Sequence, residues 1–436
     1  MEEDNKANAL IWFRGDLRVL DNSSVTAACK DNRAIAVYCF DPRHYDVSPY
    51  GFKKTEKFRA QFLIETVTAL RNELAQLNIT LLVHVDRPEH VIPELVKAHG
   101  IQRIYAQEEW TREEKEVTEA VKATLGGGIS FKTHYDQFLF HPEDLPFSGF
   151  EALPKVFTAF RKKCEKYSRV RAEATVPQPM PKDNRLPNTP IPRLEDLGLE
   201  AFETDPRTAF PFHGGAAAAR ARMDHYFWET KKLAHYKKTR NGLLGTDYSS
   251  KLSPWLANGS LSPKTVYWEV KRFEREETKN QDTYWLIFEL IWRDFFKYVS
   301  LKHGNAIFLQ GGILQKDYEW HFSKNKMEQW INGSTPEAFV NANMRELAAT
   351  GWISNRGRQN VASFWAKEWQ QDWRYGAAYF ESVLLDYDVH SNWGNWMYNS
   401  GVGNDPRDRK FNIARQAGMY DPQGKYQRLW LQETLF

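Results

Sequence analysis

The chain has few cysteines and no long apolar run. Its three cysteines, Cys29, Cys39 and Cys164, form no CxxC pair and cannot build a disulfide framework, which favours a reducing compartment. No segment approaches the roughly 20 apolar residues of a transmembrane helix, and the acidic N-terminus MEEDNKANALIWF lacks the marks of a signal or transit peptide. We therefore expect a cytoplasmic protein with no membrane partner.

The common phosphate-binding motifs are also missing. The first apolar run continues into FRGDLRVLDN, without GxGxxG or GxxxxGK, which excludes the usual dinucleotide or ATP cradle. The formal net charge of +3 neither requires nor excludes nucleic acid, because a local basic patch can exist within a nearly neutral total. A length of 436 residues with 42% hydrophobic residues indicates a globular protein of two or three domains.

The first part of the chain alternates apolar runs with amphipathic stretches. The runs predict strands at Ala9–Phe13, Ala34–Phe40, Ile79–Val85 and Arg103–Ala106, and the stretches predict helices at Lys57–Gln76 and Pro88–His99. Strands that alternate with helices predict a doubly wound, Rossmann-like parallel sheet. We assign this α/β domain to residues 1–135.

The second part reads as all-α. Six prolines between Val176 and Pro192 predict an extended connector inside an interdomain linker, residues 136–205. Residues 206–436 form the helical domain, with helices predicted at Gly215–Lys232, Pro263–Glu277, Gln281–His303, Pro336–Thr350, Asn360–Trp373 and Tyr375–Leu385. Only Trp12 and Trp110 of the 16 tryptophans precede residue 228, which hints at a use for flat aromatic rings in this half.

Two segments suit ligand binding. Ser249, Ser250, Lys251 and Ser253 precede a predicted helix, and their hydroxyls, charge and free N–H groups suit a pyrophosphate, although serine-rich loops also simply cap helices. In ELIWRDFF, a helix would place Glu289, Trp292, Arg293 and Phe296 on one face. That face indicates either a polar cavity with a flat wall for a base or a surface salt bridge beside a core tryptophan.

Three further segments leave alternatives open. Gly351–Asn360 is predicted to be a donor-rich loop with Asn355, Arg356 and Arg358, and Asp386–Asp405 a poor helix because it holds three glycines. The acids Asp386 and Asp388 have no zinc-like His or Cys spacing and fit no EF-hand, so no metal is predicted and hydrogen bonding to a heteroaromatic cofactor is favoured. Trp365, Trp369 and Trp373, at i, i+4 and i+8, predict one helical face, most simply a packing face.

Together these segments resemble the photolyase–cryptochrome family from end to end. The resemblance is carried by WFRGDLRVLDN, ELIWRDFF, TGWISNRGRQ, QQDWRYG, LLDYDVHSNWGNWMY and YQRLWL, while DYSSKLSPWLANG and SNWGNWMYNSGVGNDPR resemble its cryptochrome-DASH branch. It implies an α/β antenna domain and a helical domain that holds FAD. The flavin contacts that it implies are Tyr236, Ser249, Ser250, Lys251, Leu252 and Ser253 at the phosphates and ribityl chain, Arg293 and Asn355 around the flavin, the pair Arg358 and Asp386 beside the ring, Asp388 at its edge and Asn392 at N5.

The resemblance also implies an electron relay and a substrate site. Trp396, Trp373 and Trp320 match the relay, whereas Trp365 and Trp369 occupy positions that relatives fill with aliphatic residues, so core packing is expected there. Glu289 matches the acid that hydrogen-bonds the damaged base, and Trp292 the indole that packs on it. Tyr398 and Gln359 stand where duplex-repairing relatives have Trp and Met, which implies weaker extraction of a base from duplex. The implied DNA contacts are Arg356, Gln359, Arg407 and Arg409.

The implied activity is blue-light splitting of cyclobutane pyrimidine dimers, preferentially in single-stranded DNA, by a monomer. A signalling photoreceptor is the alternative, and a light-independent flavin or nucleic-acid binding protein is a second one. Glu109 in YAQEEWTREE resembles the acid that holds a methenyltetrahydrofolate antenna, with its neighbour Glu108 as the other candidate.

Overall fold

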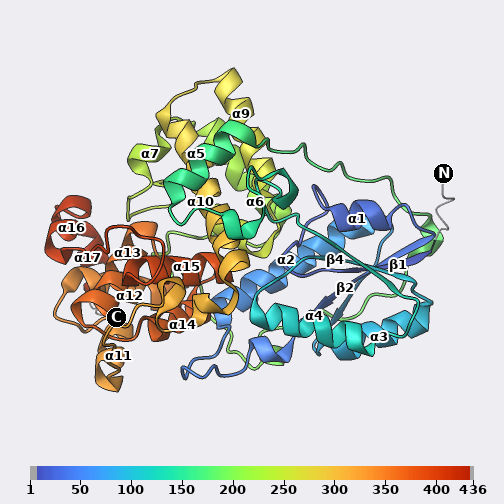
Figure 1. Cartoon of the computed structure of the whole chain (residues 1–436), viewed down its shortest axis with the longest axis horizontal. Helices are drawn as coiled ribbons and strands as arrows, with labels where there is room; N and C mark the ends of the chain where they lie inside the picture. The colour runs from blue at the N-terminus through green and yellow to red at the C-terminus, as the bar shows by residue number, and fades with distance from the viewer. Residues whose placement is uncertain (1–6, 433–436) are drawn as a thin grey trace.

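The structure, a computed structural model, describes residues 7–432 and consists of an α/β domain beside a larger helical domain (Figure 1). The α/β domain contains β1 (Asn8–Trp12), α1 (Ser23–Ala28), β2 (Arg33–Cys39), α2 (Lys57–Gln76), β3 (Leu81–His84), α3 (Pro88–His99), β4 (Arg103–Gln107), α4 (Arg112–Thr124) and β5 (Ser130–His134). In this described part the strands form one parallel sheet in the order β3-β2-β1-β4-β5.

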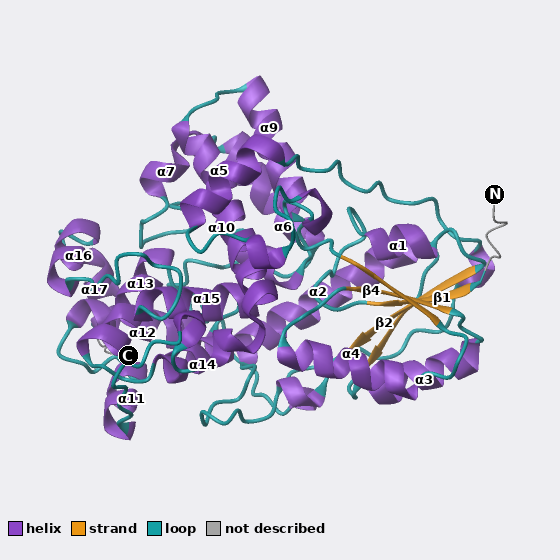
Figure 2. Cartoon of the chain, in the orientation of Figure 1, coloured by secondary structure: helices purple, strands orange, loops and turns teal. Residues whose placement is uncertain are grey.

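Helices cover both faces of this sheet (Figure 2). Along β1, Ala9 and Ile11 pack with α1 and α2, whereas Leu10 and Trp12 pack with α3 and α4, because successive side chains of a strand point to opposite faces. Burial on both faces explains the nearly continuous apolar run of β1. The predicted doubly wound sheet is confirmed.

The segment that follows β5 crosses between the two domains (Figure 1). It contains α5 (Phe157–Tyr167), which packs on the helical domain, and then a proline-rich stretch interrupted only by a short 3-10 turn at Lys182–Asn184. The side-chain amide of Asn184 accepts a hydrogen bond from the Ala34 N–H (3.1 Å) and donates to the Ala34 carbonyl (2.9 Å). The connector is therefore fastened at the N-terminal end of β2.

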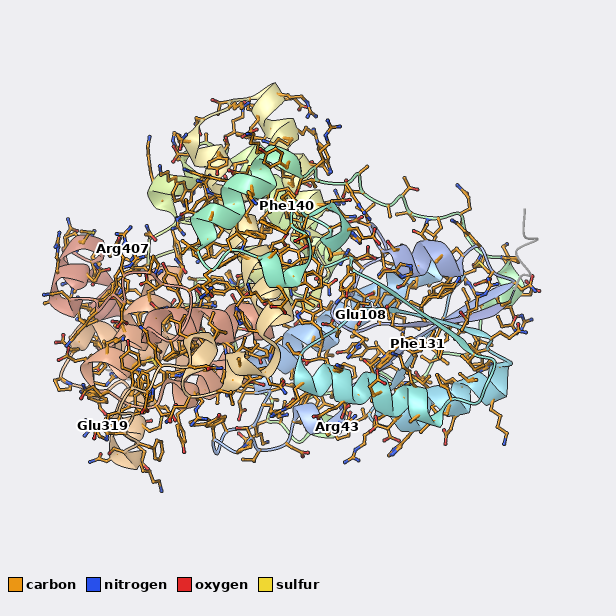
Figure 3. The ribbon with its side chains drawn as sticks, viewed as in Figure 1. Arg43, Glu108, Phe131, Phe140, Glu319 and Arg407 are labelled. Atoms are coloured by element: carbon orange, nitrogen blue, oxygen red, sulfur yellow. The ribbon has the colours of Figure 1, made fainter. Side chains whose placement is uncertain are left out.

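The helical domain is all-α over the residues that the structure describes. Its helices are α6 (Ala216–Asp224), α7 (Tyr236–Thr239), α8 (Ser253–Asn258), α9 (Pro263–Glu276), α10 (Gln281–His303), α11 (Lys324–Ile331), α12 (Ala338–Thr350), α13 (Asn355–Ser363), α14 (Trp373–Val383), α15 (Val389–Ser400), α16 (Ile413–Tyr420) and α17 (Lys425–Leu431). The long helix α10 also holds the connector, because Asp294 accepts the backbone N–H groups of Leu139 (3.0 Å) and Phe140 (2.8 Å). Phe140 is labelled in Figure 3.

Two predicted irregular segments are in fact helical. The predicted loop 351–360 is wrong beyond its first residues, because Ser354 caps the N-terminus of α13 by accepting the Gly357 N–H at 2.9 Å. The predicted poor helix 386–405 is also wrong, because Asp388 caps α15 by accepting the Ser391 N–H at 2.7 Å. Gly394 in α15 reflects close packing, since a Cβ atom there would lie 2.4 Å from the Phe296 ring.

The predicted tryptophan stripe is wrong as well. Trp365 lies in a π-helical turn, η10 (Phe364–Glu368), and Trp369 terminates that turn. The chain then reverses at Gln370, which has a left-handed φ of 53°, before Trp373 begins α14. These three tryptophans therefore do not share one helical face.

Candidate functional site: a polar cavity in the helical domain

A cavity of about 280 Å³ opens between α8, α10, α13, α14 and α15. It brings together most of the residues predicted from the sequence. The predicted residues that line it are Tyr236, Ser249, Ser250, Lys251, Leu252, Ser253, Glu289, Arg293, Asn355, Arg358, Gln359, Asp386, Asp388, Asn392 and Trp396. The sequence motifs from five separate segments thus converge on one site.

One wall of the cavity is the loop that leads into α8. The buried guanidinium of Arg222 donates to the carbonyls of Ser249 and Ser250, both at 3.0 Å, and pairs with Asp247 at 2.7 Å. Lys251 adopts a left-handed φ of 62°, and its ammonium is buried without a hydrogen-bond partner, 3.3 Å from the centre of the Tyr248 ring. Burial holds the pKa of Lys251 well below its usual value. A buried amine without a hydrogen-bond partner is costly, which indicates a place for an anionic ligand group that would hold its proton.

Two ion pairs lie at another part of the cavity wall. Arg358 donates to both carboxylate oxygens of Asp386 at 3.0 Å, and Lys297 donates to Asp388 at 2.9 Å. Burial acts to raise the pKa of Asp388, but the charges of Lys297, His390 and Arg293 and the hydrogen bond from Ser391 together outweigh it and hold that pKa well below its usual range. Asn392, one turn along α15, donates its amide to the Ala377 carbonyl at 3.0 Å. This wall offers fixed charges and amides to a polar ring.

Two polar side chains in the cavity wall have buried oxygen atoms without a hydrogen bond. The side chain of Glu289 is 29% exposed and its Oε1 lies 2.9 Å from Arg240, in a geometry that does not make a hydrogen bond. Burial raises the pKa of Glu289. The amide oxygen of Gln359 is buried without a hydrogen-bond partner. Such atoms are expected where a ligand supplies the missing partner.

Two predicted aromatic residues lie beside the cavity and do not line it. Trp292 stacks on Phe157 of α5, with ring centroids 3.7 Å apart and planes at 12°, and meets Tyr398 edge-on at 5.7 Å. The Tyr398 hydroxyl accepts a hydrogen bond from Arg409 at 2.8 Å, and Arg409 pairs with Asp405 at 3.1 Å. The residues predicted to contact DNA are thus partly engaged within the protein.

The other predicted DNA contacts lie farther out. Arg407 is exposed on the outer side of the helical domain (Figure 3). Arg356 is half-buried, with its guanidinium 4.6 Å from the centre of the Tyr420 ring.

The predicted electron relay begins at the cavity. Trp396 lines the cavity, Trp373 is fully buried and donates its indole N–H to the Gln310 carbonyl at 2.9 Å, and Trp320 is partly exposed. All three belong to, or pack against, one hydrophobic cluster.

Several cavity residues were missed from the sequence. They are Arg240, Asn395 and Asn399, which line the cavity, and Lys297, which pairs with Asp388. Helical spacing could have identified most of them, because Lys297 is one turn beyond Arg293 on α10, and the two asparagines continue the Asp388 face of α15.

The predicted antenna acid lies at the end of β4, near the junction of the two domains. Glu109 accepts a hydrogen bond from Gln107 at 2.7 Å, and a Cβ atom on Gly15 would lie 3.4 Å from its carboxylate. Burial raises the pKa of Glu109 to about 7, against the nearby charges of Arg14 and Lys297. The backbone N–H of the neighbouring Glu108, labelled in Figure 3, donates to the His134 carbonyl at the edge of the sheet.

Two family models match this arrangement of a parallel α/β domain followed by a helical domain. The family model for DNA photolyase matches residues 9–182, and the model for the FAD binding domain of DNA photolyase matches residues 285–435. The chain belongs to the photolyase–cryptochrome family.

The similar proteins carry a more particular name. The chain is 47% identical to cryptochrome DASH of Gloeobacter violaceus, over 97% of this chain and 85% of that protein. It is also 47% identical to cryptochrome DASH of Xenopus laevis, over 97% of this chain and 82% of that protein. A crystal structure of a Synechocystis cryptochrome superposes with a TM-score of 0.94 at 46% identity, covering 99% of this chain and 89% of that chain.

The residues of the cavity fit FAD. The unpartnered ammonium of Lys251 suits the pyrophosphate, and the two fixed ion pairs suit the polar edge of the flavin ring. No helix of the described chain has the length and apolar character needed to cross a membrane.

Proposed function

We propose that this protein splits cyclobutane pyrimidine dimers under blue light, preferentially in single-stranded DNA. The observation that carries the proposal is the position of Glu289 in the wall of a cavity that fits FAD, where its Oε1 atom pairs with Arg240 at 2.9 Å but makes no hydrogen bond. When bound, reduced FAD supplies the excited electron that opens the dimer. The chain itself binds the base and excludes water. Because burial raises the pKa of Glu289, its carboxyl is suited to hold a proton and donate it in a hydrogen bond to a pyrimidine carbonyl.

The single-strand preference follows from a weak aromatic wall. A lesion must leave the base stack to reach the cavity, which costs a few kcal/mol in a duplex and less in a single strand. Base stacking returns only ~1–3 kcal/mol per base. Phe157 covers one face of Trp292, and Tyr398 offers a phenol whose hydroxyl is held by Arg409. We therefore expect the site to hold a dimer that is already unstacked and to extract few from duplex.

Basic and polar side chains around the cavity would hold the flanking phosphates. Arg356, Gln359, Arg407 and Arg409 are the proposed contacts, and the protein is proposed to bind DNA as a monomer. Phosphate contacts of this kind position the strand and carry little sequence preference.

The test is repair of a thymine dimer in a single-stranded oligonucleotide and in the matching duplex, with flavin-loaded, reduced protein under blue light. We expect repair of the single strand alone, a large loss of repair in Glu289→Gln and a gain of duplex repair in Tyr398→Trp. Equal repair of both substrates would refute the single-strand preference. No repair of either, with a bound and photoreducible flavin, would favour the signalling photoreceptor.

We also propose that Glu109 holds a methenyltetrahydrofolate antenna. Its carboxyl, buried at the junction of the domains, could bind the amino-pterin edge of a folate. Glu109→Gln should lose the near-ultraviolet absorbance of the folate and keep the flavin spectrum. Glu108→Gln is the matched control and should keep both. Loss of folate in the control alone would assign the role to Glu108.

A further inference from the structure

We propose a second electron path from the cavity to the protein surface, through Trp396, Trp330, Trp365 and Trp369. It rests on the proposed flavin photochemistry of the same cavity and adds residues that the relay through Trp373 and Trp320 does not use. Trp330 had no predicted role, and Trp365 and Trp369 were expected only to pack in the core.

The four indoles form an unbroken series of ring contacts. The ring centroids of Trp396 and Trp330 are 6.1 Å apart, those of Trp330 and Trp365 are 5.2 Å apart, and those of Trp365 and Trp369 are 6.5 Å apart. Phe380, which lines the cavity, packs against both Trp396 (5.1 Å) and Trp330 (6.1 Å). Because electron tunnelling weakens steeply with the gap between rings, contacting indoles are suited to successive short hops.

The path also runs from the interior to solvent. Trp396 lines the cavity and is 2% exposed, Trp330 and Trp365 are fully buried, and Trp369 is partly exposed. Trp330 comes from α11, which lies at the outer edge of the helical domain (Figure 1). Trp396, Trp330 and Trp365 come from three different elements, α15, α11 and η10, and Trp369 ends η10, so the packing of separate elements, and not one helix, aligns the path.

The surroundings of the buried indoles Trp330 and Trp365 favour transfer of the positive charge to the next indole over loss of a proton. A tryptophan that loses an electron becomes strongly acidic at Nε1, and a nearby base would trap the charge by removing that proton. The Nε1 of Trp330 is buried without a hydrogen-bond partner, and that of Trp365 donates to the carbonyl of Asp372 at 2.9 Å, which is a very weak base. Trp369 is the first indole of the path that solvent reaches, so its proton can pass to water there.

The electrons balance along this path. One electron passes from Trp396 to the bound, light-excited oxidised flavin. Trp330 then reduces the oxidised Trp396, Trp365 reduces Trp330, and Trp369 reduces Trp365. The oxidised Trp369 loses its indole proton to water and is restored by one electron and one proton from a thiol in solution. One opposing charge is present, because the ammonium of Lys326 lies 5.6 Å from the centre of the Trp369 ring and disfavours positive charge on it.

The experiment uses protein loaded with oxidised FAD. A blue laser pulse generates tryptophan radicals that are followed by transient absorption, and mass spectrometry maps oxidised tryptophans after steady illumination in air. We expect Trp373→Phe to lower the yield of long-lived radical only several-fold and to leave the oxidation of Trp369 intact. Trp330→Phe should keep a radical, through Trp373, and lose the oxidation of Trp369. The double variant should lose the long-lived radical.

Two further variants separate the possible failures. Trp430→Phe removes a buried indole from the same hydrophobic cluster, outside the path, and should change neither readout. Trp396→Phe should abolish both. If Trp373→Phe alone abolishes the radical, or Trp330→Phe leaves the oxidation of Trp369 unchanged, the second path is refuted. If Trp396→Phe keeps both readouts, electron transfer from this cavity through tryptophan fails altogether, and the photochemistry of the proposed function fails with it.

A last variant tests whether the charge of Lys326 limits the oxidation of Trp369. Lys326→Gln removes the opposing charge and should raise the share of oxidation found on Trp369. An unchanged or lower share would contradict the transfer of positive charge to the Trp369 ring along this path.

Discussion

The substitution Gly394→Ala tests how closely α10 and α15 must approach to form the cavity. An added Cβ atom would lie 2.4 Å from the Phe296 ring, whereas carbon atoms normally meet at about 3.5–4.0 Å. Phe296 is buried and its ring lies 5.5 Å from the ring of Trp292, so it has little room to move. The two helices would therefore have to separate by roughly 1 Å.

The expected magnitude combines two opposing contributions. Overpacking of this kind costs about 1–3 kcal/mol. Replacing glycine by alanine within a helix contributes about 0.5–1 kcal/mol of stability. Gly418 in α16 supplies the control, because an added Cβ atom there meets nothing within 4 Å. Gly418→Ala should therefore stabilise the protein, and the difference between the two variants isolates the overpacking cost.

The assay is urea unfolding of the flavin-loaded protein, followed by flavin release and by helical circular dichroism. We expect Gly394→Ala to release flavin at a lower urea concentration than the wild type, and Gly418→Ala to shift unfolding to a higher one. If both variants shift unfolding in the same direction by the same amount, α10 and α15 have room between them and the packing argument is wrong.

Two further predictions concern buried charges. Lys297→Met leaves the carboxylate of Asp388 buried without its partner and should lower the free energy of unfolding by ~3–5 kcal/mol. The double variant Lys297→Met/Asp388→Asn should recover part of this loss. No recovery in the double variant would contradict the loss of the ion pair as the cause. Burial raises the pKa of Glu346 to about 7, against a hydrogen bond from Tyr426. Because the folded state then holds a proton that the unfolded state has released, stability should fall as the pH rises from about 4.3 to 7, and Glu346→Gln should flatten that fall in urea midpoints measured across the range. Parallel pH profiles for the two proteins would contradict the assignment.

Much of the α/β domain could be predicted from apolar runs, because strands buried on both faces leave a continuous signal. The strand β5 was missed for the opposite reason. Its sequence, SFKTH, is polar and partly exposed, since it lies at an edge of the sheet and pairs only with β4. Lysine on an edge strand is a common protection against pairing with other chains, and it removes the apolar pattern on which prediction relies.

Most residues of the cavity could be predicted from the sequence, but the contacts between distant segments that shape it could not. Glu289 and Arg293 follow from the spacing of α10, but Trp292 stacks on Phe157, which lies far earlier in the chain, and no local pattern indicates that contact. The glycines in the segment of α15 argued against a helix. Gly394 is there because Phe296 comes too close for a side chain, and such a contact between distant segments is visible only in the folded molecule.

The two ion pairs of the cavity wall affect how much the site must rearrange when an electron is transferred. Asp386 is held by two hydrogen bonds from Arg358, and Asp388 by Lys297 and by the first turn of α15. Groups that are already oriented do not need to turn when the charge beside them changes, so the reorganisation energy of electron transfer stays small. A forward transfer and its return can then both be fast in a site whose atoms hardly move.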